Sequence, residues 1–174
     1  EAQARAAFAA GARCVTHLYN AMSPLGHRAP GLTGAALDSA ACVGIIPDGL
    51  HVEKTPFRLA AALAGGRLFA VSDAMALAGT DATRFTLNGR TITRAGGRLT
   101  LPDGTLAGAD ITLPQALRWM TATAGLPLDT ALAMMTRIPA QVLGIADRGV
   151  LTPGARADLL HLGADLHPRP LWQG

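Results

Sequence analysis

Imidazole and carboxylate side chains follow three separate apolar segments of the sequence. His17 and Asn20 follow the first segment, Asp48 and His51 follow the second, and Asp73 follows the third. Such groups can bind a divalent metal ion, and a carboxylate can also accept a proton and return it during a reaction. A single histidine in such a place is more often a hydrogen-bonded core residue. The recurrence of polar residues at three corresponding positions favours a functional site instead.

The segments that carry these residues alternate with helical patterns. The helical patterns occupy residues 2–10 and 55–64, and short apolar runs of β-prone residues occupy 12–18, 41–46 and 68–72. Strands that are apolar on both faces and alternate with helices predict a parallel sheet that is covered on both sides. Ligands of parallel α/β folds bind at the carboxyl ends of the strands, where the polar residues stand. The sequence therefore predicts an α/β protein with a site at that edge.

The pattern changes after Asp73. Residues 85–101 alternate with a period of two around Asn88-Gly89, which predicts an antiparallel β-hairpin. Helical patterns then resume at residues 113–123, 128–135 and 138–143. Near the end, residues 157–162 read as one strand that resembles part of a separate small β-domain.

The composition excludes several classes of protein. The chain has 174 residues, of which 49% are hydrophobic, with 15 Lys and Arg against 12 Asp and Glu. No apolar run approaches the roughly 20 residues that span a bilayer. Cys14 and Cys42 are too isolated for a disulfide scaffold or a cysteine-based zinc motif. The basic residues are scattered and only two Trp and one Tyr could stack on bases, so we expect neither nucleic acid nor a membrane as a partner.

Five motifs, in chain order, carry a resemblance to a known family. They are Thr16-His17-Leu18-Tyr19-Asn20-Ala21-Met22, Arg28-Ala29-Pro30-Gly31, Gly44-Ile45-Ile46-Pro47-Asp48-Gly49-Leu50-His51-Val52, Ser72-Asp73-Ala74-Met75 and Gly104-Thr105-Leu106-Ala107-Gly108. With them the sequence resembles the N-acetylglucosamine-6-phosphate deacetylases, a family of the metal-dependent amidohydrolase superfamily. The later segment Gly154-Ala155-Arg156-Ala157-Asp158-Leu159 resembles the tail of the wider superfamily.

The resemblance implies that the chain is the C-terminal part of a (β/α)8 TIM barrel, with its parallel strands as barrel strands six, seven and eight. Residues 1–148 are then a partial barrel with the hairpin insertion at about 85–101, and residues 149–174 are a terminal piece of a small β-sandwich domain. A complete barrel takes about 200 residues or more. We therefore expect the 174 residues to belong to a longer enzyme and to be inactive, or nearly so, alone.

The resemblance also implies roles for two of the polar residues. Hydrolysis of an acetamide needs an activated water and a polarised carbonyl group, and a bound divalent metal ion supplies both. His17 is implied as a ligand of this ion, with zinc as the expected metal and iron, cobalt or manganese as the other candidates. Asp73 is implied as the carboxylate that takes a proton from the attacking water and gives it to the leaving amine. The alternative for Asp73 is a helix N-cap.

The implied substrate is N-acetylglucosamine 6-phosphate, which yields glucosamine 6-phosphate and acetate. The guanidinium of Arg28 is a planar, permanent cation that suits phosphate oxygens. We expect residues 106–108 to form a loop that closes against the sugar, where Gly108 permits a close approach of the backbone. The other positions that match substrate-binding residues of the family are Asn20, Ala21, Asp48, Gly49, Leu50, His51, Leu106 and Ala107.

The expected partner is therefore a small amino-sugar phosphate, and we expect the parent protein to be a homodimer. Residues 1–12 lack the pattern of a signal peptide, so we expect a cytoplasmic protein. Two alternatives stay open. One is a related amidohydrolase that acts on another amide or a cyclic amide, which is favoured if Arg28 is unimportant for a phosphorylated substrate. The other is a non-catalytic half-barrel whose unpaired sheet edge associates with a complementary half or with itself.

Overall fold

A three-stranded parallel sheet lies at the centre of the N-terminal part of the molecule. The structure is a computed structural model and describes residues 1–172. Strands β1 (Cys14–Val15), β2 (Cys42–Ile45) and β3 (Leu68–Ala70) pair in the order β1-β2-β3, with Cys14 opposite Cys42 and Val43 opposite Leu68. Each strand lies inside the run that predicted it, so the prediction of a parallel α/β sheet is confirmed.

Three α-helices belong to this part of the fold, namely α1 (Ala2–Ala9), α2 (Gly31–Leu37) and α3 (Lys54–Ala64). Helix α3 begins where the carboxylate of Glu53 accepts a hydrogen bond from the Thr55 N–H at 2.8 Å. It buries a face that includes Phe57 and continues into a short 3-10 turn, η1 (Gly65–Arg67). Helices α1 and α3 match the predicted patterns, whereas α2 was not predicted.

The segment after β3 forms a four-stranded antiparallel sheet. Its strands are β4 (Arg84–Leu87), β5 (Arg90–Ala95), β6 (Arg98–Thr100) and β7 (Leu106–Ala109), in sequence order. Asn88 and Gly89 connect β4 to β5 with positive φ angles of 50° and 74°, as a two-residue hairpin turn requires. The hairpin predicted over 85–101 is confirmed. The expected loop at residues 106–108 is wrong, because these residues form strand β7 and pair with β6.

Helices resume after β7 and lead to a terminal β-ribbon. Helix α4 (Leu113–Arg118) runs into a short π-helix, η2 (Trp119–Thr123), and is followed by α5 (Leu128–Met135) and α6 (Arg137–Val142). The side chain of Gln115 accepts a hydrogen bond from the Thr112 N–H at 2.8 Å and so caps α4. Strands β8 (Leu159–Leu162) and β9 (Pro168–Trp172) pair antiparallel. The sequence predicted β8 but not its partner.

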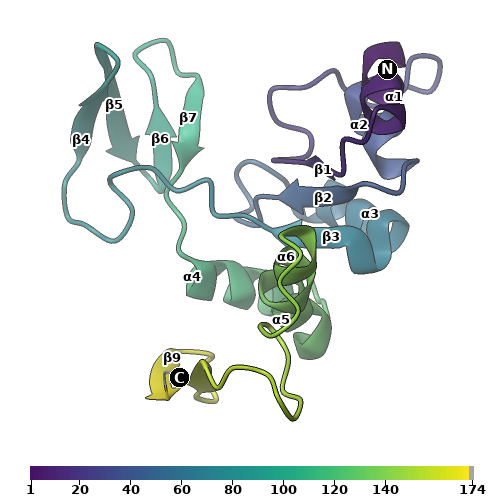
Figure 1. Cartoon of the computed structure of the whole chain (residues 1–174). Helices are drawn as coiled ribbons and strands as arrows, with labels where there is room; N and C mark the ends of the chain where they lie inside the picture. Colours follow the sequence, from purple (N-terminus) through teal and green to yellow (C-terminus); the bar gives the residue numbers. More distant parts are fainter. Residues whose placement is uncertain (173–174) are drawn as a thin grey trace.

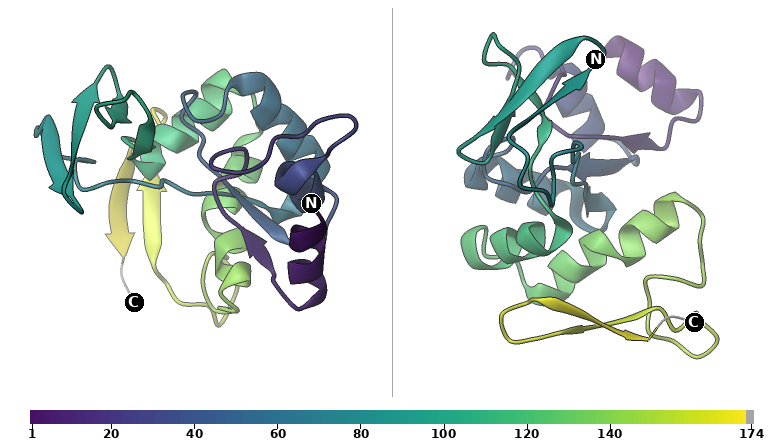
Figure 2. Two further views of the ribbon diagram at one scale, coloured as in Figure 1. Left: turned by 90° about the horizontal axis from the view of Figure 1, so that it is seen from above. Right: turned by 90° about the vertical axis from the view of Figure 1, so that its left-hand side faces the viewer.

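Figure 1 shows the four-stranded sheet β4–β7 set to one side of the parallel sheet, joined to it by the chain that follows β3. Helices α4–α6 lie between the parallel sheet and the β8–β9 ribbon, as the right-hand view of Figure 2 also shows. The largest buried cluster joins the parallel sheet to α3, α5 and α6, and a separate cluster of Leu77, Ile92 and Leu99 lies under the antiparallel sheet. In residues 1–172, no helix is both long enough and apolar enough to cross a membrane.

Candidate active site

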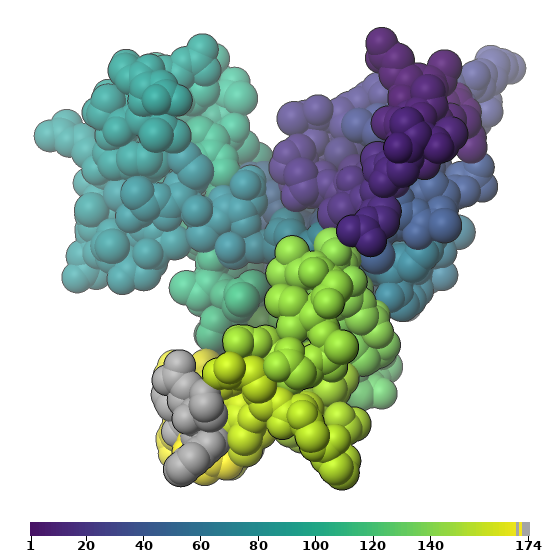
Figure 3. All heavy atoms as spheres, viewed as in Figure 1, coloured from purple at the N-terminus to yellow at the C-terminus, as the bar shows by residue number. Residues whose placement is uncertain are grey.

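The predicted site residues follow the carboxyl ends of the parallel strands. His17 follows β1, Asp48 follows β2 and Asp73 follows β3. Pairing continues past the end of β1, since the Leu18 N–H donates to the Gly44 carbonyl oxygen at 2.8 Å. The strand order puts the Asp48 segment between the other two segments at one edge of the sheet. In the space-filling view, a hollow separates the four-stranded sheet from the part of the chain that contains α1 and α2 (Figure 3).

The ring of His17 is held in one tautomer. Its Nδ1 atom lies 3.0 Å from the backbone carbonyl oxygen of Asn20. A carbonyl oxygen can only accept a hydrogen bond, so Nδ1 carries the proton and Nε2 of the neutral ring keeps its lone pair. Backbone carbonyls commonly orient metal-binding histidines in this way. The arrangement therefore suits His17 to bind a metal ion through Nε2.

The backbone around His17 is strained and fixed by its neighbours. His17, Tyr19 and Ala21 have φ angles of 38°, 75° and 51°, in the left-handed region that costs an L-residue about 1–2 kcal/mol. Leu18 between them is fully buried, and the Tyr19 hydroxyl donates to the Pro56 carbonyl oxygen at 3.0 Å. Burial raises the pKa of Tyr19, which keeps this hydroxyl protonated. Strain of this kind persists where the surroundings over-determine it, often at functional sites.

Asn20 and Ala21 are placed differently in this turn. The side-chain amide of Asn20 donates to the Leu18 carbonyl oxygen at 3.1 Å, so its NH2 group serves the turn itself. Ala21 is exposed, and within residues 1–172 its N–H has no hydrogen-bond acceptor. A free backbone N–H in a left-handed turn is suited to bind an anion.

Arg28 lies in an exposed loop that is anchored at both ends. The Ser23 hydroxyl accepts a hydrogen bond from the Leu32 N–H at 2.7 Å, and the Ser23 carbonyl accepts one from the buried Thr33 hydroxyl at 3.0 Å. Across the residues that the structure describes, the Arg28 side chain has no hydrogen bond or ion pair and is not joined to the other site residues. Its guanidinium is therefore available to an external anion.

Asp48 and His51 form a buried hydrogen-bonded pair. The Asp48 Oδ2 atom lies 2.6 Å from His51 Nδ1, and only 6% and 7% of the two side chains are exposed. Asp48 Oδ1 also accepts from the backbone N–H groups of Leu50 at 2.8 Å and His51 at 2.7 Å. Burial alone would raise the pKa of Asp48, but the hydrogen bonds from His51 and Leu50 outweigh it and hold the pKa below its usual value. The carboxylate thus stays charged and fixes the imidazole.

Gly49 lets this turn pack against an aromatic side chain that the sequence did not identify. Its φ angle is 76°, and a Cβ atom there would lie 2.7 Å from Nε1 of Trp119. Trp119 in turn packs edge-to-face on Phe57 of α3, with ring centroids 5.1 Å apart. The indole therefore braces the Asp48–His51 turn from behind. Trp119 stands in a helical pattern, and nothing in that pattern pointed to the site.

Asp73 occupies a strained and exposed position. Its φ angle is 47°, and no side-chain hydrogen bond or ion pair of Asp73 is found among residues 1–172. Its backbone is paired, because the Ala109 N–H donates to the Asp73 carbonyl oxygen at 2.8 Å and the Met75 N–H donates to the Ala109 carbonyl oxygen at 3.2 Å. The backbone at Asp73 is thus fixed by Ala109, whereas its carboxylate is exposed and available to an external group.

Gly108 permits this pairing. A Cβ atom on Gly108, whose φ angle is 80°, would lie 2.4 Å from Cγ of Met75 and 3.1 Å from the Asp73 carbonyl oxygen. The predicted close approach of a sugar to Gly108 stays a prediction. In the structure, the close neighbours of Gly108 are Met75 and Asp73. Leu106 and Ala107 are partly buried in β7 beside it.

The described residues offer one clear metal ligand. Across residues 1–172, no group of three or more His, Cys, Asp and Glu side chains could together hold a metal ion. His17 fits such an ion because its Nε2 lone pair is directed by the bond at Nδ1. A catalytic zinc site commonly uses three protein ligands, and the described residues do not bring three such side chains together.

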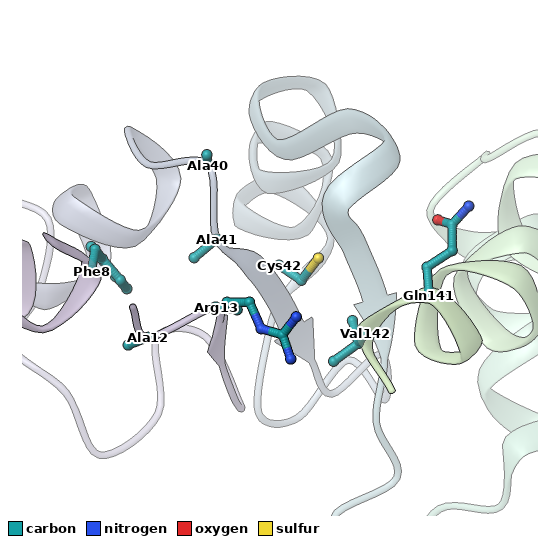
Figure 4. A pocket seen from close by; sticks show the side chains of 8 residues that line it. All are labelled: Phe8, Ala12, Arg13, Ala40, Ala41, Cys42, Gln141 and Val142. Atoms are coloured by element: carbon teal, nitrogen blue, oxygen red, sulfur yellow. The ribbon is translucent and has the colours of Figure 1, made fainter. Parts of the chain in front are cut away.

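A pocket of about 310 Å3 lies elsewhere. It is lined by side chains from α1, α6 and the starts of β1 and β2, including Phe8, Arg13, Cys42 and Val142 (Figure 4). No predicted site residue lines it. The pocket is at the opposite ends of β1 and β2 from His17 and Asp48.

Comparison with known proteins gives the family. The amidohydrolase family matches residues 1–174. The chain belongs to the amidohydrolase family. This family is metal-dependent, in agreement with the arrangement of His17. The prediction that the chain is part of an amidohydrolase is therefore confirmed.

Within the amidohydrolase family, the chain is similar to two curated relatives and one solved structure that are all amino-sugar-phosphate deacetylases by name. It is 38% identical to the N-acetylgalactosamine-6-phosphate deacetylase of Escherichia coli O157:H7, over 98% of this chain and 46% of that protein. It is 39% identical to the N-acetylglucosamine-6-phosphate deacetylase of Haemophilus influenzae, over 90% of this chain and 42% of that protein. The crystal structure of the N-acetylglucosamine-6-phosphate deacetylase of Pasteurella multocida matches with a TM-score of 0.93 and 38% identity, over 95% of this chain and 44% of that one. The amidohydrolase chain thus spans under half the length of these three proteins.

Proposed function

We propose that the whole protein hydrolyses the acetamide group of N-acetylglucosamine 6-phosphate to glucosamine 6-phosphate and acetate. The observation that carries the proposal is the placement of His17 and Asp73, both at positive φ, at one edge of a parallel sheet in an amidohydrolase chain. The two side chains have complementary chemistry, a metal ligand and a proton carrier.

His17 is proposed to hold the metal ion through Nε2, together with ligands from outside the described residues. Zinc is the metal we propose, because imidazole nitrogen is one of its usual ligands and catalytic zinc sites combine it with carboxylate oxygen. When bound, a divalent ion polarises the amide carbonyl group and lowers the pKa of a water molecule.

Asp73 is proposed as the general base and then the general acid. It takes a proton from the attacking water and later gives this proton to the nitrogen of the leaving amine, so one carboxylate serves both steps. The exposure of Asp73 fits this role, since its carboxylate makes no hydrogen bond with any side chain of residues 1–172. Its paired backbone fixes the point from which the carboxylate extends.

The sugar phosphate is proposed to bind between three segments. The Arg28 guanidinium and the free Ala21 N–H suit the phosphate oxygens. His51 is oriented by Asp48 and presents Nε2 to a phosphate or hydroxyl group of the sugar. Asn20, Gly49 and Leu50 are proposed to contribute from the turns, and Leu106, Ala107 and Gly108 from strand β7.

We further propose that β1, β2 and β3 are strands six, seven and eight of a (β/α)8 barrel. Residues 1–148 then belong to the barrel and 149–174 to a small β-sandwich domain. The parallel order of the three strands and the TM-score of 0.93 support this assignment. With a single clear ligand among residues 1–172, we expect little turnover from the 174 residues alone. The homodimer and the cytoplasmic location stay predictions.

N-acetylgalactosamine 6-phosphate is the second candidate substrate. The relative from Escherichia coli O157:H7, at 38% identity, is named for this sugar. The two sugars differ only in the orientation of one ring hydroxyl, so the same proton transfers and the same phosphate contacts serve both.

The test is an assay of the whole protein with each sugar phosphate, supplied in turn with zinc, iron, cobalt and manganese. Acetate and free amine are measured together. We expect both products in equal amounts, and much less of them from N-acetylglucosamine without its phosphate. Absence of both products with all four metals and both sugar phosphates would refute the proposal.

A further inference from the structure

The guanidinium of Arg94, in the antiparallel sheet, joins the two segments that hold Asp73. Arg94 is on β5, and 19% of its side chain is exposed. Its Nη1 donates to the carbonyl oxygens of Thr80 at 2.6 Å and Ala82 at 3.0 Å, and its Nη2 also donates to the carbonyl oxygen of Leu77. These three acceptors belong to the segment that directly follows Asp73. One side chain thus fixes the course of the backbone beyond the carboxylate.

The same guanidinium holds the segment on the other side of Asp73. Nη2 of Arg94 donates to Asp110 Oδ1 at 2.7 Å, and Nε lies 2.7 Å from Asp110 Oδ2. Asp110 is only 14% exposed, so little water competes for this ion pair, in which the Nη2 contact is the hydrogen bond. It directly follows Ala109, whose N–H and carbonyl oxygen bond to Asp73 and Met75.

We propose that Arg94 is a positioning residue for Asp73, and that the four-stranded sheet carries it for this purpose. A φ angle of 47° at Asp73 is unfavourable for an L-residue and needs surroundings that enforce it. Arg94 supplies them by tying Ala82 and Leu77 on one side to Asp110 on the other. The inference rests on the proposed function, because it is the proton transfer by Asp73 that requires a fixed position of this residue.

The positioning role predicts a local effect that a general loss of stability does not. Arg94→Lys keeps the positive charge but replaces the five-donor fork by one ammonium group, which cannot reach Asp110 and three carbonyl oxygens together. The control is Arg84→Lys on β4. Arg84 is exposed, and its side chain makes no hydrogen bond or ion pair with the rest of the described chain.

The first measurement is amide hydrogen exchange of Ala109 and Met75, read against Phe57 in α3. For Arg94→Lys we expect exchange of Ala109 and Met75 to rise about tenfold or more, with Phe57 unchanged. Arg84→Lys leaves all three amides as in the wild type. Unchanged protection of Ala109 and Met75 in Arg94→Lys would overturn the inference. So would an equal rise at Phe57, because it would mean a global loss of stability.

The second measurement is turnover by the metal-loaded whole protein. A displaced Asp73 lowers kcat by about 10–100-fold and leaves KM nearly unchanged, since Arg94 does not touch the phosphate site. A kcat equal to that of Arg84→Lys would overturn the inference. If the wild-type protein itself releases no acetate, the proposed function fails, and the exchange of Ala109 and Met75 still decides whether Arg94 holds the Asp73 segment.

Discussion

The Nδ1 atom of His17 donates its proton to the backbone carbonyl oxygen of Asn20, at 3.0 Å. This bond is made inside a turn in which both His17 and Ala21 have positive φ angles. The turn therefore selects the tautomer of the ring and leaves Nε2 as the only nitrogen that can bind a metal ion. The ligand geometry is set by the backbone, before any metal arrives.

Removal of the imidazole weakens metal binding in the whole protein. We expect His17→Ala to lower the zinc affinity at least about 10–100-fold. Loss of a residue that only orients a metal ligand has an effect of this size, and loss of the ligand itself should have no smaller one. His161→Ala is the control, since His161 is an exposed residue of β8. The zinc affinity of the two variants is measured from their metal content after dialysis against graded zinc buffers. Equal zinc content in His17→Ala and the control would remove His17 from the ligands.

Arg28 governs affinity for the phosphate group. We expect Arg28→Ala to raise KM for N-acetylglucosamine 6-phosphate by about 10–100-fold, because a charge-assisted bond to an anion contributes about 1.5–3 kcal/mol. The kcat value changes little, since Arg28 is not tied to Asp73. Steady-state kinetics check it, with Arg58→Ala on α3 as an exposed control. An unchanged KM would favour an amidohydrolase with an unphosphorylated substrate.

Gly49→Ala destabilises the protein for two separable reasons. Its φ angle of 76° costs about 1–2 kcal/mol for an L-residue, and a Cβ atom 2.7 Å from Trp119 Nε1 adds about 1–3 kcal/mol for overpacking. Gly89→Ala is the matched control, with a φ angle of 74° and nothing within 4 Å of the added Cβ. Urea unfolding checks it. Equal losses in the two variants would contradict the close packing of Trp119.

A double variant isolates the contact with the indole. Trp119→Phe shortens the ring system that meets the new Cβ atom, so in this background Gly49→Ala costs about as much as Gly89→Ala. If the cost of Gly49→Ala is the same with either aromatic residue, Trp119 does not brace the turn.

The stability contributed by Asp48 depends on pH. The folded-state pKa of Asp48 lies below the usual value of 3.8, so the contribution is complete well above this value. It is lost as the pH falls through the folded pKa, because the carboxylate must then be protonated. We expect Asp48→Asn to cost about 2 kcal/mol at pH 7 and less in acid. Urea midpoints of the wild type and variant across this range check it.

The control for this titration is Asp81→Asn. Asp81 is exposed and has no side-chain hydrogen bond among residues 1–172. Its substitution should leave the free energy of unfolding within about 0.5 kcal/mol of the wild type at every pH. A pH-independent cost for Asp48→Asn would show that its hydrogen bonds, and not its charge, stabilise the turn.

The sequence could predict the elements whose signals are local. The apolar runs before His17, Asp48 and Asp73 predicted the three parallel strands, and Asn88-Gly89 predicted the hairpin. Helix α2 was missed because its sequence, Gly31–Leu37, includes two glycines. Burial of Thr33 and its bond to Ser23 stabilise this helix, and such tertiary contacts leave no local signal. Strand β9 was missed because Pro168 and Pro170 argue against a strand, although prolines are tolerated at a sheet edge.

The candidate site divides in the same way. Polar residues after apolar runs marked His17 and Asp73, whereas their supports come from distant segments. Arg94 and Trp119 are ordinary members of a strand pattern and a helix pattern, so neither could be selected from the sequence. Gly108 was selected for an approach to the sugar, whereas its packing against Met75 became visible only when β7 paired with the Asp73 segment.

The most direct test of the proposed mechanism is the kcat of Asp73→Asn in the whole protein, measured on N-acetylglucosamine 6-phosphate at a metal content equal to that of the wild type. The substitution keeps the size of the side chain and removes its ability to accept the proton. We predict a fall in kcat of about 100–10,000-fold, the usual contribution of a positioned acid and base, with metal still bound. A kcat within a few fold of the wild type would contradict the account.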